Sequence, residues 1–223
     1  NPHQESSIYV SDYNDKHLGF SQIHGKELSY NNNNDMFASL EILNTLKKNS
    51  GTVIIKHANP CGVSENKVPL ISFKNAFISD PISAFGGVIA CNYKINKKIA
   101  SEISKNFLEV LLANGFDKDS LEVLKRKQNL RIIDISNFKL KNIISIKSFD
   151  RSFLLQSKNN IILDKKKLKC VTKLKPNKKE LAEIQFAFNI CKHVKSNAIV
   201  LCNNFSTIGI GAGQPSRLDS CKI

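Results

Sequence analysis

Two adjacent basic side chains, Lys56 and His57, are the first candidates for chemistry in this sequence. They follow residues 52–55, a β-branched run that predicts a buried strand, and a turn is predicted to begin at Ala58. Ligand sites of α/β proteins lie at the carboxyl ends of strands, so both side chains could reach one pocket. Histidine suits proton transfer near neutral pH, and lysine can stabilise a developing oxyanion. The alternative is a strand end whose basic tips lie in solvent.

Three further segments contain residue types that suit a binding site. Residues 80–87 hold a proline and a glycine pair in a predicted turn, where Gly86 permits a ligand to approach the backbone closely. Asn197 could donate its amide to an oxyanion or, alternatively, cap the end of a helix. Residues 209–217 form a glycine-rich turn before a predicted helix, which suits anion binding, and Arg217 could make a forked contact. The alternative for residues 80–87 is an ordinary helix–strand turn, and the alternative for residues 209–217 is a glycine-rich packing turn.

Two familiar signatures are incomplete in this sequence. His3, Glu5 and Cys61 resemble part of a zinc deaminase signature, but Ser64 stands where the second cysteine belongs, which leaves too few ligands. Gln214 likewise replaces the last glycine of the dinucleotide-binding fingerprint. The six cysteines include no CxxC pair, which argues against a structural zinc site or a disulfide scaffold and is typical of reduced thiols in a cytoplasm.

The charge of the chain has two interpretations. Thirty-three basic and 19 acidic residues give a formal net charge of +14, which would suit a nucleic acid or another polyanion. The other interpretation is a codon bias toward lysine and asparagine on solvated faces. The densest basic cluster, Lys165, Lys166, Lys167 and Lys169, contains no aromatic residue that could stack on bases, and the chain has only four arginines. No apolar run approaches the roughly 18 residues that a membrane helix needs.

The elements that must position these side chains alternate between helices and buried strands, which indicates an α/β fold with a parallel or mixed sheet. Helices are predicted at residues 35–48, 69–79, 96–104, 120–128 and 177–194. Asp35 is predicted to cap the first of these helices. Strands are predicted at residues 52–55, 87–91, 107–113, 130–135, 143–147, 152–156, 198–202 and 207–210.

Strings that span the chain from its first residues to residue 217 are together similar to one family. They are NPHQ at 1–4, LSYNN at 28–32, KHANPCG at 56–62, DPISAFGG at 80–87, VTK at 171–173, VKSNAIV at 194–200 and the glycine-rich segment at 207–217. In type and order they resemble the aminoimidazole carboxamide ribonucleotide (AICAR) formyltransferase domain of the bifunctional purine biosynthesis enzymes. The resemblance implies a cytidine-deaminase-like α/β/α fold, duplicated in the full domain and without the catalytic zinc. It also implies formyl transfer from 10-formyltetrahydrofolate to the 5-amino group of AICAR, the penultimate step to IMP.

The resemblance assigns roles to individual positions. It implies that His57 is the proton acceptor, that Lys56 stabilises the transition state, and that Asn197 contacts the nucleotide, where its amide could also serve the oxyanion. Further substrate contacts are implied at Asn32, Phe85, Gly86, Glu109 and Arg217, and Leu218 corresponds to a folate contact.

The resemblance also implies a cytoplasmic homodimer with active sites at the subunit interface, without a catalytic metal and without a nucleic-acid or membrane partner. Residues 1–135 are expected to form the first deaminase-like subdomain, 136–175 a connection, and 176–223 the start of the second subdomain. An upstream arginine–tyrosine pair, the C-terminal part of the formyltransferase domain and the cyclohydrolase domain are absent, so we expect an internal fragment that is incomplete for catalysis. The alternative function is a basic nucleic-acid-binding α/β domain, whose affinity would fall steeply with salt.

Overall fold

The central strands of the main sheet are buried on both faces, so the fold is built in layers around them. The computed structural model describes residues 4–7, 19–140, 144–159, 161, 163–164 and 167–223. Its strands are β1 (Ser21–His24), β2 (Gly51–Lys56), β3 (Asn59–Glu65), β4 (Val88–Cys91), β5 (Val110–Ala113), β6 (Arg131–Asp134), β7 (Ile144–Phe149), β8 (Ser152–Ser157), β9 (Ile199–Asn203) and β10 (Ser206–Gly211). Its helices are α1 (Tyr30–Leu43), α2 (Pro69–Ser79), α3 (Lys97–Ile103), α4 (Lys118–Leu124), α5 (Lys178–Cys191) and α6 (Arg217–Lys222).

Eight strands form one mixed sheet in the order β1-β6-β5-β4-β2-β3-β10-β9. Strands β4, β5 and β6 are parallel, whereas the other neighbours pair antiparallel. The C-terminal strands join the sheet at β3, where Ser206 pairs with Ser64 and their hydroxyl oxygens lie 2.8 Å apart. The expected α/β class with a mixed sheet is therefore confirmed.

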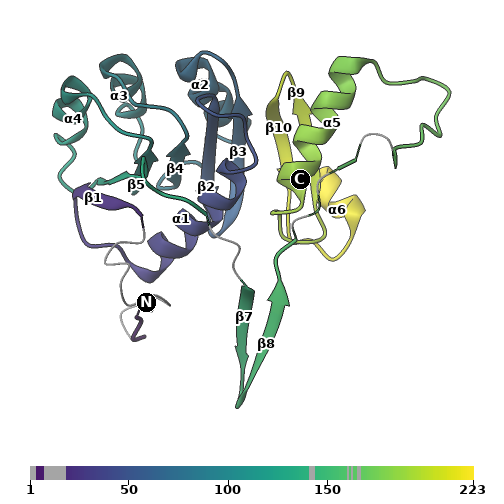
Figure 1. Ribbon diagram of the computed structural model, residues 1–223, viewed down its shortest axis with the longest axis horizontal. Helices are drawn as coiled ribbons and strands as arrows, with labels where there is room; N and C mark the ends of the chain where they lie inside the picture. The colour runs from purple at the N-terminus through teal and green to yellow at the C-terminus, as the bar shows by residue number, and fades with distance from the viewer. Residues whose placement is uncertain (1–3, 8–18, 141–143, 160, 162, 165–166) are drawn as a thin grey trace.

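Alternating side chains along the strands divide the core into two halves. Ile54, with its neighbours of the same orientation in β4, β5 and β6, packs with the buried residues of α2, α3 and α4. Val53 and Ile55 point the other way and pack with the apolar residues of α1 and α5. This alternation is the period of two expected of a strand, and it covers both faces of the sheet with helices. Figure 1 shows α2, α3 and α4 side by side along one side of the sheet.

Several predicted elements agree with the structure, but the bounds of others differ. The strand predicted at 107–113 begins at Val110, and the helix predicted at 120–128 spans Lys118–Leu124. Helix α2 has the predicted bounds, and α3 is capped by Asn96 as expected. The first helix, however, begins at Tyr30 rather than near Asp35, because Ser29 caps it and forms a capping box with Asn32. Asp35 therefore lies one turn inside α1, where its carboxylate is free to serve another segment.

Two strands were not predicted. Strand β3 contains Pro60 and Gly62, which are normally read as breakers, although its interior residues are buried against β2 and α2. Strand β1 is a short edge strand that pairs antiparallel with β6. Residues 1–3 of the NPHQ string, residue 143 of a predicted strand, and Lys165 and Lys166 lie outside the described residues.

A separate hairpin of β7 and β8 projects away from the sheet (Figure 1). Both of its strands are exposed along their whole length. Within the described part of the chain, no helix combines the length and the apolar character needed to cross a membrane.

Candidate active site

The predicted catalytic pair lies at the tight hairpin between β2 and β3. Lys56 ends β2 and pairs with Asn59, so His57 and Ala58 alone form the turn. Both have positive φ, 54° and 57°, as the tightest two-residue hairpins require. The turn thus begins at His57, one residue earlier than predicted, and it leaves this histidine exposed to solvent.

A carboxylate of α1 holds the backbone of this turn. Asp35 accepts hydrogen bonds from the N–H of His57 at 3.1 Å and from the N–H of Ala58 at 2.7 Å. Both oxygens of the carboxylate are used, one for each donor. Sequence reasoning missed this contact, because Asp35 had been expected to cap its own helix.

The ammonium group of Lys56 reaches the second candidate segment. Its Nζ donates to the carbonyl of Phe85 at 2.6 Å. The ring of Phe85 lies 5.0 Å from that of Phe107, and the N–H of Gly86 donates to the carbonyl of Phe107 at 3.0 Å. Gly86 has a φ of 71°, and an added Cβ would lie 3.3 Å from the Phe107 ring, so the position favours glycine. The structure thus brings Lys56, Phe85 and Gly86 together.

Glu109 is oriented by groups from two directions. The buried Asn32 donates its amide to Oε2 at 2.8 Å, and Nη1 of Arg131 lies 4.0 Å from the same oxygen. The Asn32 side chain is itself fixed, because its Oδ1 accepts from the N–H of Ser29. Of the run Asn31–Asn34, Asn32 is the member that donates to Glu109.

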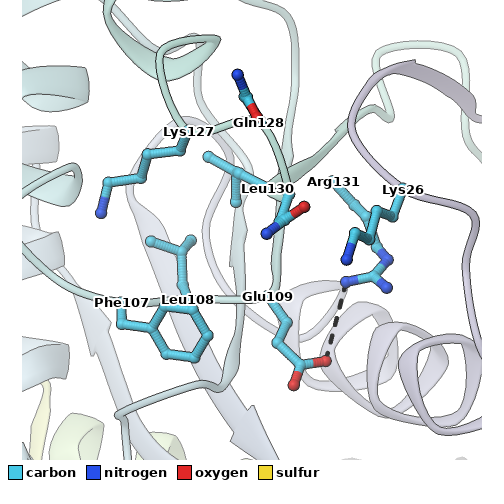
Figure 2. Close-up of a pocket in the computed structure, with 9 residues that line it drawn as sticks. Lys26, Phe107, Leu108, Glu109, Lys127, Gln128, Leu130 and Arg131 are labelled. Carbon is cyan, nitrogen blue, oxygen red and sulfur yellow. Dashed lines mark ion pairs between the residues drawn. The ribbon is translucent and has the colours of Figure 1, made fainter.

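A cavity of about 430 Å³ adjoins Glu109. Figure 2 shows Glu109 and Arg131 facing each other in its wall, with Lys26 beside Arg131. The remaining lining residues are Phe107, Leu108, Lys127, Gln128, Asn129 and Leu130. Lys56 and His57 do not line this cavity, so it adjoins Glu109 rather than the predicted catalytic pair.

The remaining predicted residues form a second group, which meets the first at Asn59. The Oδ1 of Asn59 accepts from the N–H of Lys195 at 3.1 Å, and its amide lies 3.4 Å from the carbonyl of His57. Two residues further on, the amide of Asn197 donates to the carbonyls of Gln214 and Pro215 at 3.1 and 2.8 Å. Helix α5 ends at Cys191, so the alternative of a helix cap at Asn197 is wrong.

The glycine-rich segment leads into a helix, as predicted, but a very short one. Ser216 caps α6, and Arg217 and Leu218 are its first two residues, both exposed. Asn197 fixes the loop just before them, and the hydroxyl of Ser220 donates back to the Asn197 carbonyl at 2.9 Å. Asn197, Arg217 and Leu218 are therefore parts of one assembly.

Cys61, in β3, is the cysteine nearest in the sequence to the predicted catalytic pair. Burial, assisted by the nearby Asp80 carboxylate, raises the pKa of the Cys61 thiol to about 12, so this thiol stays protonated at neutral pH. Among the described residues, no group of three or more His, Cys, Asp or Glu side chains is placed to hold a metal ion. The site instead offers an exposed imidazole, an ammonium group and a carboxylate.

Comparison with known proteins agrees over the full sequence. The family model described as AICARFT/IMPCHase bienzyme matches residues 1–223. A relative named bifunctional purine biosynthesis protein PurH from Thermoanaerobacter sp. (strain X514) is 42% identical over 98% of this chain and 43% of its own length. Proteins of the same name from Elusimicrobium minutum and Bartonella tribocorum are 43% and 41% identical over all of this chain and 42% of theirs. The chain spans about two-fifths of the length of these curated relatives. The match over its entire length shows that the chain belongs to the AICARFT/IMPCHase bienzyme family.

Proposed function

We propose that this chain supplies the first part of an AICAR formyltransferase, which transfers the formyl group of 10-formyltetrahydrofolate to the 5-amino group of AICAR. The product is the formamido nucleotide that leads to IMP, and the parent protein also carries IMP cyclohydrolase activity. The observation that carries the proposal is the β2–β3 hairpin. It holds His57 at an exposed turn directly after Lys56, and the Nζ of Lys56 donates a hydrogen bond to the carbonyl of Phe85, the residue before Gly86.

The proposed chemistry begins with a weak nucleophile. The lone pair of the 5-amino group is delocalised into the imidazole ring, so a base must remove a proton as the nitrogen attacks the formyl carbon. Neutral His57 takes this proton, and the new C–N bond yields a tetrahedral intermediate with a negative oxygen. Collapse of that intermediate expels the folate nitrogen, which receives a proton from Lys56 or from the protonated His57.

Lys56 is the donor that we favour for the oxyanion. Its ammonium group has three N–H donors, and the Phe85 carbonyl uses one of them. Both hydrogens of the Asn197 amide, by contrast, are directed at the carbonyls of Gln214 and Pro215. We therefore assign Asn197 mainly to holding the loop that carries Arg217, and donation to the oxyanion would require these bonds to be exchanged.

The nucleotide is proposed to bind between two groups of residues that meet at Asn59. One group contains Lys56, Phe85 and Gly86, and the other contains Asn197, Arg217 and Leu218. The backbone at Gly86 and the ring of Phe85 would contact AICAR, and the Glu109 carboxylate suits the donors of a ribose or a carboxamide. Asn32, Arg217 and, for folate, Leu218 complete the proposed contacts. The fixed orientation of the Glu109 carboxylate supports this assignment, because a positioned acceptor loses little freedom when the substrate binds.

The finer fold assignment and the partners are also proposals. We assign residues 1–135 to a first cytidine-deaminase-like α/β/α subdomain without catalytic zinc, 136–175 to a connection, and 176–223 to the start of its duplicate. The layered sheet, with helices on both faces, supports the first of these. We further propose that the parent protein acts in the cytoplasm as a homodimer with active sites at the interface.

The assignment of His57 is tested by His57→Ala in the full-length protein. Turnover is expected to fall by roughly 100-fold or more, because general-base catalysis contributes about that factor. The dissociation constant for AICAR should stay within about tenfold of the wild-type value, since the nucleotide has several other contacts. Equilibrium binding and initial rates measure the two effects separately. A large loss of affinity with intact turnover contradicts the role of His57 as a base.

A further inference from the structure

The turn that carries His57 has a backbone that ordinary residues avoid. His57 and Ala58 both have positive φ, and neither is a glycine, which is the residue that adopts this conformation without steric cost. Residues of this kind persist in such a conformation only where the surroundings hold them there. The two residues are consecutive, so the whole turn depends on a restraint.

Asp35 supplies that restraint from another element. Its two carboxylate oxygens accept the N–H of His57 and the N–H of Ala58, at 3.1 and 2.7 Å. Two successive N–H groups that converge on one anion form the kind of backbone concavity that binds anions. Asp35 is only partly buried, and it makes these bonds in place of capping its own helix.

The same helix also orients the acidic contact of the site. Asn32 lies three residues before Asp35, on the same side of α1, and donates to Glu109. Helix α1 thus orients Glu109 through the side chain of Asn32, and it holds the backbone of the His57 turn through the side chain of Asp35. Lys56 is held independently, by its ladder in β2 and by the Phe85 carbonyl.

We propose that Asp35 is a positioning residue for formyl transfer, which fixes the imidazole of His57 through the backbone of the turn. The inference rests on the proposed function, because it takes His57 as the base of formyl transfer. It assigns no contact between Asp35 and substrate. Without the carboxylate, the β2–β3 ladder alone holds the positive φ values, so the turn can distort and the imidazole moves relative to the bound amino group. A displacement of about 1 Å at a reacting group costs on the order of 100-fold in rate.

The test is Asp35→Asn in the full-length protein, assayed by AICAR-dependent release of tetrahydrofolate. Asparagine keeps the size of the side chain but replaces one of the two acceptors by a donor. We expect kcat to fall about 100-fold, whereas KM for AICAR changes less than about threefold, because Gly86 and Glu109 are unaffected. Asn34→Ala, at an exposed position one residue away on α1, is the matched control and should retain wild-type kcat.

A second substitution separates positioning from a general structural or charge effect. Ala58→Gly added to Asp35→Asn lets the turn adopt positive φ without the carboxylate. We expect this double variant to recover kcat to within about tenfold of the wild-type value. An electrostatic action of Asp35 on His57 would leave the double variant as slow as the single one, and that result overturns the proposal. Should Asp35→Asn not fold, Asp35→Ser, which retains one acceptor, is compared with and without Ala58→Gly in the same way.

Failure of this inference is distinguishable from failure of the proposed function. A wild-type protein without AICAR-dependent release contradicts the proposed function itself. An active wild-type protein that loses turnover in His57→Ala, but keeps wild-type kcat in Asp35→Asn, contradicts only the role of Asp35.

Discussion

At the scale of single residues, Glu41 shows how one carboxylate can join distant segments. It lies on α1 and forms an ion pair with Lys158, just after β8, and its other carboxylate oxygen lies 3.7 Å from Nδ1 of His193, just after α5. The His193 side chain, and then Lys158, hold the pKa of Glu41 at about 2, against the opposing effect of burial. The ordinary value is 4.5, so the folded state favours the ionised form.

This lowered pKa gives a stability that depends on pH. Its contribution is fully present above about pH 4.5 and is lost as the pH falls toward 2, where the folded carboxyl takes up its proton. Glu41→Gln should lower the free energy of unfolding by on the order of 1–2 kcal/mol at pH 7, after allowance for partial exposure. Urea denaturation from pH 7 to pH 3 should show this difference shrinking. The exposed Glu122→Gln serves as the control, and a difference that stays constant with pH would contradict the assignment.

At the scale of elements, α2 packs directly on β3 at Gly62. A Cβ added there would lie 1.8 Å from the carbonyl oxygen of Ala76, a backbone atom of α2, so the helix would have to move. We expect Gly62→Ala to lower the free energy of unfolding by about 3 kcal/mol. Gly209→Ala is the matched control in β10, because its added Cβ meets nothing nearer than a Leu201 methyl at 4.0 Å. The urea midpoints of the two variants measure the effect, and equal midpoints would rule out the close contact.

The sequence predicts elements well where local signals decide them. Pro69 and Asn96 mark the starts of α2 and α3, because a proline in the first turn and a capping side chain are local features. Strand β3 could not be predicted in this way, since its pairing with β2 and its packing on α2 outweigh Pro60 and Gly62. The start of α1 was missed because the run of asparagines hides the helical period.

The candidate site could be predicted only in part, for a similar reason. Lys56 and His57 follow a recognisable strand, so their place at its end was predicted from the pattern. The role of Asp35 depends on a contact between residues more than 20 positions apart, which neither period nor spacing reveals. The same holds for Asn59, which joins the turn to residue Lys195.

At the scale of the whole molecule, the β7–β8 hairpin presents an apolar face that the described residues leave exposed. Ile146 pairs with Leu155, and Ile144 and Phe153 lie two residues away on the same face, all more than half exposed. A lone two-stranded hairpin is marginally stable in water, so this face is expected to be covered by other protein. A second copy of the chain fits the proposed homodimer.

Replacing Ile146 and Leu155 together by aspartate in the full-length protein should therefore weaken the dimer. We expect the dissociation constant, from sedimentation velocity over a range of concentrations, to rise at least about tenfold, because two buried apolar side chains become charged. Ser145→Asp with Gln156→Asp, a directly opposed pair on the other face, is the control. Dimers of equal strength in both double variants would show that the apolar face is not at the interface.

The most direct test of the account uses the complete protein that contains this chain, with and without His57→Ala. Release of tetrahydrofolate from 10-formyltetrahydrofolate is followed with and without AICAR. We expect release that requires AICAR and that the substitution nearly abolishes. A folded wild-type protein that releases no tetrahydrofolate in response to AICAR would contradict it.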